Sequence, residues 1–425
     1  MDYELDREVR QGSWRTDCLE RVSRNRILTF RNLFFLILNF KTTIQKELDS
    51  FFRMVDGSDY SIRKVTKSAF TQARSKIDPF VFKRFNKVAA DTFYAQAKHI
   101  LWHNFRVLAV DGSRVCLPNH PSIKEEFGEH GFGPKAEANQ SLALISMLYD
   151  VLNLITLDSS IGKYTDSERD HLVNHMDRMQ KGDLLLLDRG YPCFWLFFLL
   201  KAKGIDFCIR LTDDWWKQVN GFLKETHLEK IVSFELPKKD REKLDGYPEF
   251  QDVSIQVRLI KVKLPNGEIE ILCSSLIDQK QFGIEEFKEL YQLRWREEEG
   301  YKMLKCRVEL ENWSGKTATA VRQDFYAKIF ITTLLSAYKH PIEQKVKEEF
   351  EQNKDREYGQ KTNSTFALSA LREGLFGLFI KKEIRRVLEF FDKIVYQTRE
   401  IIRPNRSNPR PKKRKRHFYD AYKHY

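Results

Sequence analysis

The segment Tyr291–Lys305 carries an aromatic ring, two cations and a carboxylate at spacings that a helix brings onto one side. In YQLRWREEEGYKMLK, Tyr291, Arg294, Glu298 and Lys305 follow one another at intervals of three, four and seven residues. At about 100° per helical residue, the four positions fall within a stripe about 60° wide. Such a stripe can hold a phosphodiester and a metal ion, whereas the plain alternative is the solvated face of an amphipathic helix.

Two aspartates interrupt apolar segments earlier in the chain. Asp111 lies in RVLAVDGSRV and Asp188 in DLLLLDRGYP. A buried unpaired carboxylate is costly, so each needs a turn, an arginine or a metal as partner. The simplest partner is a turn, because Gly112 and Gly190 follow the two aspartates. Together with Glu298, however, they supply three carboxylates for one cluster.

A cluster of Asp111, Asp188 and Glu298 suits Mg²⁺, a hard ion that takes oxygen ligands, and Mn²⁺ is expected to substitute. Two such ions about 4 Å apart would activate an attacking water or 3′-hydroxyl and stabilise the leaving oxygen. Arg294 would then bind phosphate through its planar fork and Lys305 as a point charge.

The elements that must position the two aspartates alternate strands with helices. The predicted strands are 106–117, 141–149, 152–159, 183–188 and 206–211, and the predicted helices are 167–180 and 192–202. Ser167 and Asp170 open the first helix at capping-box spacing. This order, three strands and then helix–strand–helix–strand, is that of a ribonuclease H-like core, an α/β fold with a mixed sheet and helices on both faces. In such a core the first and fourth strands are neighbours, which would place Asp111 beside Asp188.

The flanking sequence predicts four regions. They are a helical N-terminal DNA-end-binding domain at 1–100, a catalytic domain at 101–320 with a β insertion at about 212–282, C-terminal helices at 321–402 and a basic tail at 403–425. Within the insertion, strands 252–264 and 268–276 flank a hairpin turn at 265–267. Long helices are predicted at 321–338 and 381–396.

A short capped helix is predicted at Thr66–Ile77 within the first region. Its exposed face is expected to present Gln72, Arg74 and Lys76. Such a helix either enters a major groove or lies as an ordinary surface helix.

The net charge favours a polyanionic partner. The chain of 425 residues has a formal charge of +13, and residues 403–425 hold nine Lys or Arg against one Asp. That tail is either an arm for DNA or a solvated segment. The scattered cysteines predict neither zinc nor disulfides and fit a reducing cytoplasm. The acidic, polar start predicts no signal peptide, and the apolar runs 34–40 and 194–200 are too short for a bilayer, so no membrane partner is expected.

The pattern Y-x-x-R-x-x-x-E-x-x-x-x-x-x-K resembles the signature of the insertion-sequence-4 family of DDE transposases. The companion segments VLAVDGSRVCLP, SERDHL, LLLLDRGYP, FCIRL and ELENWSGKT also resemble the family, as does the tail NRSNPRPKKRKR. The resemblance covers about residues 60–416.

The resemblance implies cut-and-paste transposition of double-stranded DNA at terminal inverted repeats, through nicking, release of the ends and strand transfer. It assigns Asp111, Asp188 and Glu298 as metal ligands. It further implies that Tyr291, Arg294 and Lys305 contact phosphates at the transposon end. Arg210, in FCIRL, is a further predicted DNA contact. The implied working unit is a homodimer on paired ends, in a bacterial cytoplasm and associated with the nucleoid.

One departure from the family concerns a tryptophan. Members of the family stack a flipped base on a tryptophan in the strand before the signature helix, and Glu268–Cys273 has none. Possible substitutes, each expected to have a core role instead, are Trp215, Trp216, Trp295 and Trp313. A hairpin intermediate is therefore left open. Two other functions also stay open: a catalytically silent DNA-binding protein of transposon origin, and a metal-dependent nuclease on the same fold.

Overall fold

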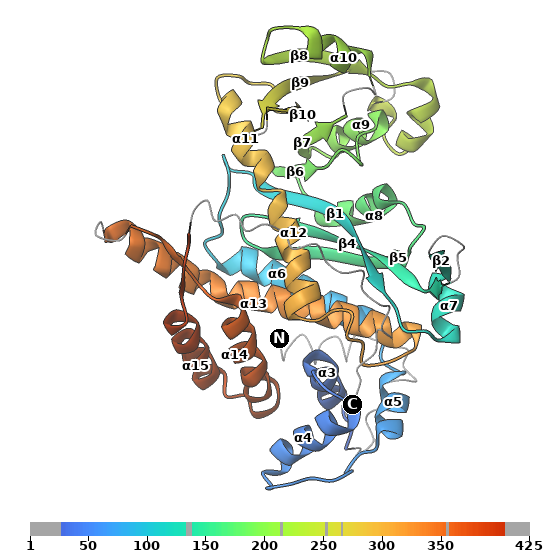
Figure 1. Ribbon diagram of the computed structural model, residues 1–425, viewed down its shortest axis with the longest axis vertical. Helices are drawn as coiled ribbons and strands as arrows, with labels where there is room; N and C mark the ends of the chain where they lie inside the picture. Colours follow the sequence, from blue (N-terminus) through green and yellow to red (C-terminus); the bar gives the residue numbers. More distant parts are fainter. Residues whose placement is uncertain are drawn as a thin grey trace. The chain divides into compact units, whose positions relative to one another are not determined.

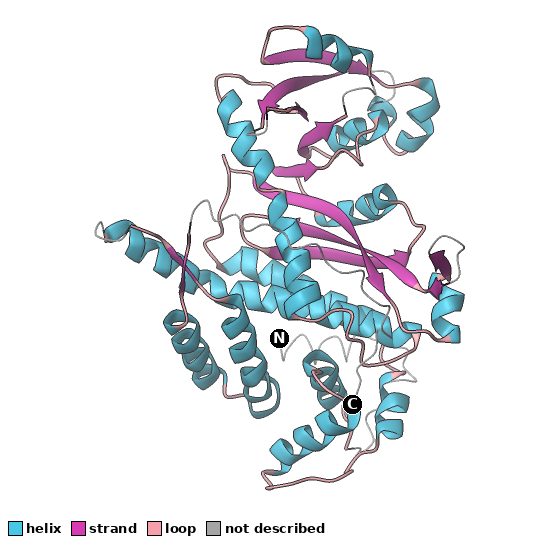
Figure 2. Cartoon of the chain, in the orientation of Figure 1, coloured by secondary structure: helices cyan, strands magenta, loops and turns pink. Residues whose placement is uncertain are grey.

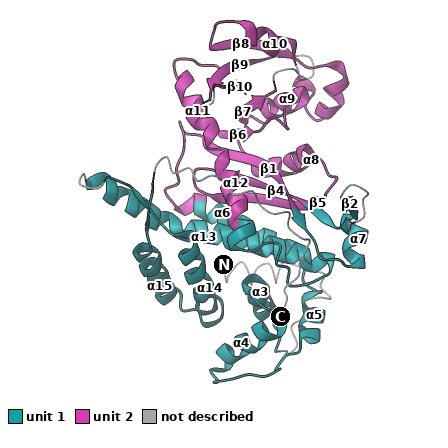
Figure 3. Ribbon diagram, viewed as in Figure 1, with its two compact units in different colours: residues 1–93, 115–143, 304–425 teal, residues 94–114, 144–303 magenta. Residues whose placement is uncertain are grey.

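The structure, a computed structural model, describes residues 27–132, 138–212, 216–250, 254–264, 267–353 and 357–403. The chain forms two compact units, coloured separately in Figure 3. Unit 1 comprises residues 1–93, 115–143 and 304–425, and unit 2 comprises residues 94–114 and 144–303. Trp215, most of the 265–267 turn and the basic tail beyond residue 403 lie outside the described residues. The four predicted regions have other bounds than these units and stay a prediction.

An eight-stranded sheet forms the centre of unit 2, in the order β5-β4-β1-β6-β7-β10-β9-β8 (Figure 1). Its strands are β1 (Arg106–Cys116), β4 (Leu142–Asp150), β5 (Ile155–Lys163), β6 (Asp183–Leu187), β7 (Asp206–Leu211), β8 (Glu229–Glu235), β9 (Ser254–Lys263) and β10 (Ile269–Ser274). The first five strands follow the predicted ribonuclease H-like order, with the first strand beside the fourth. The α/β class and this core are thereby confirmed.

Alternating side chains of the sheet pack against helices on its two faces. Leu108 of β1 and Leu185 of β6 share one buried cluster with Phe197 of α9 (Phe194–Ala202). On the other face, Ala109 shares a cluster with Leu290 of α11 (Ile284–Gln292). The first cluster also takes in α8 (Glu168–His175) and α10 (Lys217–Lys224), and α12 (Trp295–Lys302) follows α11. Because strand side chains point alternately to opposite faces, both faces of this sheet are apolar.

The strands of the predicted β insertion extend the same sheet. β10 pairs antiparallel with β7, with Leu272 opposite Arg210, and β9 and β8 follow beyond it. The insertion therefore covers the edge of β7, which would otherwise expose unpaired N–H and C=O groups. It also contains α10 and two short 3₁₀ segments, Lys238–Leu244 and Pro248–Phe250, where only strands were expected.

Unit 1 is mainly helical, as Figure 2 shows. Its helices are α3 (Phe30–Asn39), α4 (Ile44–Asp56), α5 (Lys67–Arg74), α6 (Phe80–Gln96, ending in unit 2), α7 (Pro121–Phe127), α13 (Ala318–Gln352), α14 (Ser364–Phe376) and α15 (Ile384–Gln397). Unit 1 also contains a small hairpin, β2 (His130–Phe132) with β3 (Ala138–Gln140). A second antiparallel pair joins strands distant in the sequence, β11 (Gln360–Lys361) with β12 (Glu400–Ile401). Aromatic rings fill its core, where Phe34 stacks on Phe82 with ring centroids 4.8 Å apart. In the described part of the chain, no helix has the length and apolar character to cross a membrane.

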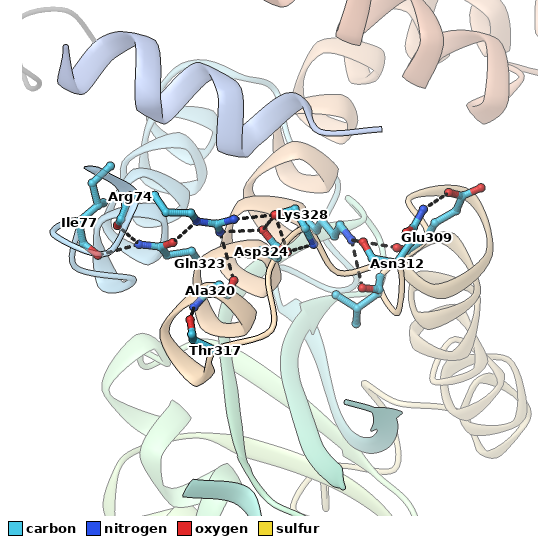
Figure 4. A network of polar contacts seen from close by, with 11 residues as sticks. Arg74, Ile77, Glu309, Asn312, Thr317, Ala320, Gln323, Asp324 and Lys328 are labelled. Carbon is cyan, nitrogen blue, oxygen red and sulfur yellow. Dashed lines mark hydrogen bonds and ion pairs between the residues drawn. The ribbon is translucent and has the colours of Figure 1, made fainter. Parts of the chain in front are cut away.

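Arg74 corrects the prediction of an exposed reading helix. α5 forms as predicted and Thr66 caps it, with Gln72 and Lys76 exposed. Arg74, however, is only 3% exposed. Its guanidinium donates to Gln323 and Asp324 of α13 at 2.9 and 3.1 Å and also to Ser314, a network drawn in Figure 4. Arg74 lies four residues after Phe70 and shares the buried face of α5 with it, where its acidic partner comes from α13.

Candidate active site

The pairing of β1 with β6 places Asp111 and Asp188 at the same level of the sheet. The two strands are parallel and Ala109 lies opposite Leu186, so each aspartate follows two residues beyond this pair. Residues two apart in a strand share a face. By this alternation both carboxylates leave the sheet on the side of the Ala109–Leu290 cluster, which α11 covers.

Each aspartate also caps its own turn. Asp111 Oδ1 accepts a hydrogen bond from the Gly112 N–H at 2.8 Å, and Asp188 Oδ1 accepts one from the Gly190 N–H at 2.7 Å. Burial, together with the negative charges of Asp188 and Glu168, raises the pKa of Asp111 to about 6 against the opposing effects of the Gly112 bond and of Arg294. The turn N–H group is thus one partner of each aspartate. Around Asp111, however, the negative charge is not fully balanced.

Glu168, the first residue of α8, is a fourth carboxylate in this region. A Cβ built on Gly112 would clash with the Glu168 carboxylate, so glycine at 112 lets this side chain lie against the β1 backbone. Burial and the charge of Asp188 raise the pKa of Glu168. The predicted cap residue, Ser167, does precede α8, but its side chain makes no capping bond. The helix also ends at His175 rather than at 180, followed by a 3₁₀ turn.

Glu298 and Asp111 are linked through Arg294. Arg294 Nη2 is 3.2 Å from Glu298 Oε1, and Arg294 Nη1 is 3.9 Å from Asp111 Oδ2. The guanidinium is largely buried, whereas Glu298 is half-buried. Within the described ranges, no three His, Cys, Asp or Glu side chains are already grouped as metal ligands. Arg294 here neutralises charge that a cation would otherwise neutralise.

The prediction of one regular helix from Tyr291 to Lys305 is wrong. α11 ends at Gln292 and α12 starts at Trp295. At this junction the bonds Arg294 N–H to Tyr291 O and Glu297 N–H to Arg294 O, at 3.1 and 3.0 Å, join residues three apart. After α12, Met303–Arg307 form a π-helical turn. Three-residue turns rotate more per residue than an α-helix and π turns rotate less, so a uniform 100° step misplaces the later side chains.

Glu297 is the residue that the sequence reasoning missed. It is fully buried, and its Oε1 accepts a hydrogen bond from the Asp111 N–H at 2.8 Å. Burial, together with the charge of Asp111, raises the pKa of Glu297 well above its usual range. A signal was present: Glu297 lies seven residues after Leu290 and four before Tyr301, within the apolar stripe. A charged residue in such a stripe indicates a buried partner.

The remaining predicted site residues have different surroundings. Tyr291 is buried, and its hydroxyl donates to the Leu187 carbonyl at 3.4 Å. Arg210 Nη1 forms an ion pair with Glu270 Oε1 at 2.7 Å, from β7 to β10. Unit 2 therefore holds six of the seven predicted residues: Asp111, Asp188, Arg210, Tyr291, Arg294 and Glu298.

Lys305 belongs to unit 1, in the π-helical turn. Burial lowers the pKa of Lys305, and the charge of Glu311 opposes this effect. Glu311 also accepts a hydrogen bond from the Cys116 N–H at 2.9 Å. The amine therefore lies in a partly desolvated, acidic environment of its own unit.

The candidate tryptophans divide into core and surface residues. Trp313 is fully buried, and its indole N–H donates to the Cys116 carbonyl at 2.8 Å. Trp216 stacks on Phe194 with ring centroids 4.4 Å apart. Their expected core roles are confirmed, but the same expectation is wrong for Trp295, which is 59% exposed on α12.

Ser146, His175 and Asp158 form a hydrogen-bonded chain with the connectivity of a hydrolytic triad. His175 Nδ1 lies 2.9 Å from Asp158 and its Nε2 lies 3.0 Å from Ser146 Oγ. All three residues are buried, so no substrate reaches the hydroxyl. These hydrogen bonds therefore form a polar network inside unit 2 that connects α8 to β4 and β5.

Comparison with known proteins finds a matching transposase family and a related transposase. The model of the family "Transposase DDE domain" matches residues 102–334, more than half of the chain. The Transposase InsG for insertion sequence element IS4, from Escherichia coli strain K12, is 22% identical over 248 residues. This match covers 58% of the chain and 54% of that transposase, so the chain spans about half the length of this curated relative.

A structural comparison finds the piggyBac transposase in its synaptic complex with hairpin DNA. The TM-score is 0.42 with 11% sequence identity, and the match covers 89% of this chain and 80% of the other. Asp111, Asp188 and Glu298 all lie within the part that the family model matches. On the match of the family model and the likeness to the IS4 protein, the chain belongs to the DDE transposase family and is of the IS4 type.

Proposed function

We propose that this protein is a DNA transposase that moves an insertion sequence by cutting and joining DNA at terminal inverted repeats. The observation that carries the proposal is the β1–β6 register, which sets Asp111 and Asp188 level with each other. Arg294 faces Asp111 and pairs with Glu298, which supports a common role for these two carboxylates. The family match supports the same reading.

The carboxylate group fits a divalent cation by its chemistry. Asp111, Asp188 and Glu298 supply oxygen donors only, which Mg²⁺ and Mn²⁺ prefer. The raised pKa of Asp111 reflects burial and uncompensated negative charge, both of which a bound cation would relieve. When bound, Mg²⁺ would polarise the phosphodiester and lower the pKa of the attacking water or hydroxyl.

Four residues of the chain are proposed to bind DNA phosphates. The Arg294 guanidinium, already beside the carboxylates, has the planar fork that suits a phosphate. Tyr291, Arg210 and Lys305 are the others, and Arg210 would exchange Glu270 for phosphate. The proposed partner is double-stranded DNA bound by a homodimer in the bacterial cytoplasm. The helical N-terminal region and the basic tail would add contacts to the ends.

The test is a Mg²⁺-dependent cleavage assay on DNA that carries the flanking ends of the gene. Wild type is compared with Glu298→Gln and with Glu299→Gln, an exposed neighbour on α12 that pairs with Lys302. Cutting at the ends by wild type and Glu299→Gln, but not by Glu298→Gln, supports the proposal. If Glu298→Gln cuts at the normal rate, Glu298 is not the third carboxylate.

A catalytically silent DNA-binding protein is the second candidate, and one observation favours it. Glu298 pairs with Arg294, so the third carboxylate already has a cationic partner. Specific end binding by wild type without any cutting in Mg²⁺ or Mn²⁺ would select this candidate. A metal-dependent nuclease, in contrast, would cut the ends without joining them to a target plasmid.

A further inference from the structure

Both main-chain groups of Asp111 are held by side chains of α12. The Asp111 N–H donates to Glu297 Oε1 at 2.8 Å, and the Tyr301 hydroxyl donates to the Asp111 carbonyl at 2.7 Å. Glu297 and Tyr301 are four residues apart, one turn of the same helix. The peptide groups on either side of the Asp111 side chain are therefore fixed by one rigid element.

In a regular sheet, the Asp111 N–H and C=O of β1 would form hydrogen bonds with the main chain of a neighbouring strand. The Val151 N–H donates to the Val107 carbonyl at 3.0 Å, which sets the antiparallel register of β1 with β4. Four residues further along β1 and four back along β4, Asp111 lies opposite Met147. The Tyr301 hydroxyl also hydrogen-bonds the Met147 main chain. Side chains of α12 thus enter the β1–β4 ladder at the position of Asp111.

Glu297 is a costly acceptor for a single main-chain N–H. It is fully buried, and its Oε2 has no hydrogen-bond partner among the described residues. Close to it, the buried Tyr191 hydroxyl also lacks a partner in this part of the chain, and burial, followed by the charges of Glu168 and Glu297, raises the pKa of Tyr191. Burying a carboxyl with an unsatisfied oxygen is costly, and well-packed apolar replacements of buried charged groups are often neutral or stabilising. A residue retained at such a cost points to function.

We propose that Glu297, with Tyr301, is a positioning residue that fixes the Asp111 carboxylate for metal binding. It acts through the Asp111 main chain and is not itself a metal ligand. The inference rests on the proposed metal-dependent function of Asp111. Residues that orient metal ligands typically affect metal affinity or activity by about 10–100-fold.

The experiment measures binding of Mn²⁺ alone, by calorimetry on the full chain, and DNA cleavage by the same proteins. Glu297→Leu removes the acceptor, Glu297→Gln retains an oxygen for the Asp111 N–H, and Tyr301→Phe removes the second bond with little change in volume. Glu299→Leu on the exposed side of α12 is the matched control. Urea unfolding monitors the stability of each variant.

Glu297→Leu and Tyr301→Phe are expected to weaken Mn²⁺ binding by about 10–100-fold and to lower kcat with little change in KM for DNA. Glu297→Gln is expected to stay within about threefold of wild type, and Glu297→Leu to unfold at a lower urea concentration, because the Asp111 N–H loses its acceptor. Wild-type Mn²⁺ affinity in Glu297→Leu and Tyr301→Phe overturns the inference. An equal loss of Mn²⁺ affinity in Glu297→Gln also overturns the inference. The carboxylate charge of Glu297 would then be required, and not only its hydrogen bond to the Asp111 main chain.

Two further outcomes separate this inference from the proposed function. If wild type binds Mn²⁺ but cuts no DNA, the transposase proposal fails and the Mn²⁺ affinities alone decide the role of Glu297. If wild type binds no Mn²⁺, both are overturned. If Glu297→Leu does not fold, Tyr301→Phe decides the result, because it deletes one oxygen and leaves the ring in place.

Discussion

Arg294 and Glu298 form an ion pair one helical turn apart, with Arg294 Nη2 3.2 Å from Glu298 Oε1. The same guanidinium faces Asp111, so one cation stands between two of the three signature carboxylates. Arg294 lies at the tightened junction of α11 and α12, where three-residue bonds turn its side chain toward the sheet. From this position the Arg294 guanidinium can contact the carboxylates and a bound DNA phosphate together.

Replacing Arg294 by lysine is expected to lower cleavage by about 10²-fold or more while DNA binding weakens much less. Lysine keeps the charge but loses the planar fork that contacts a carboxylate and a phosphate together. Single-turnover cleavage and fluorescence anisotropy with labelled ends measure the two effects. Lys302→Arg on the exposed face of the same helix is the control. Equal cleavage by Arg294→Lys and wild type would show that only the charge matters.

Asp111→Asn is expected to stabilise the metal-free protein at pH 7. The pKa of Asp111 is about 6 in the folded state against 3.8 ordinarily, so the folded state holds its proton more tightly. Wild-type stability therefore falls as pH rises through the window from about 4 to about 6, and aspartate costs up to about 3 kcal/mol above it. Asparagine removes this penalty.

Urea unfolding of wild type and Asp111→Asn in EDTA at pH 4 and pH 7 measures the effect. The variant should be more stable at pH 7 and equal to wild type near pH 4. Added Mg²⁺ should narrow the gap at pH 7, because the cation favours the charged aspartate. A constant difference at both pH values would contradict the raised pKa of Asp111.

The core of unit 2 followed from the sequence because its signals are local. Apolar runs and turn residues mark β1, β6 and β7 within a residue or two, and their order alone sets Asp111 beside Asp188. The side-chain directions in Tyr291–Lys305 could not be predicted in the same way. The tightened junction at Arg294 and the later π turn depart from regular α-helical geometry. Glu297, in contrast, does lie in the regular apolar stripe with Leu290 and Tyr301, and its charge there indicated a buried partner.

Long-range partners were also out of reach of the sequence patterns. Arg74 lies four residues after Phe70 on the buried face of a short helix, and its acidic partner Asp324 is 250 residues further along the chain. The Arg210–Glu270 pair likewise depends on β10 joining β7, which the pattern of the insertion did not specify. Local periodicity predicts elements, whereas burial of a charge depends on which elements meet.

Glu270→Gln is expected to strengthen DNA binding a few-fold and to steepen its salt dependence. The substitution removes the carboxylate that pairs with Arg210 and leaves the guanidinium for phosphate. Arg210→Gln should weaken binding at all sequences and lower the salt slope by about one. Anisotropy titrations between low and physiological salt measure both slopes. If neither substitution changes the slope, Arg210 does not contact phosphate and its pair with Glu270 only joins β7 to β10.

Arg74→Ala is expected to destabilise unit 1 by about 3–5 kcal/mol, because Asp324 would be left buried without its cation. Asp324 would retain only the bonds that Ser314 donates. The double variant Arg74→Met with Asp324→Leu should recover much of the loss, since no buried charge remains. Urea unfolding measures both, with Lys76→Ala on the exposed side of the α5 region as control. If Arg74→Ala instead retains wild-type stability and loses end binding, Arg74 reads DNA after all.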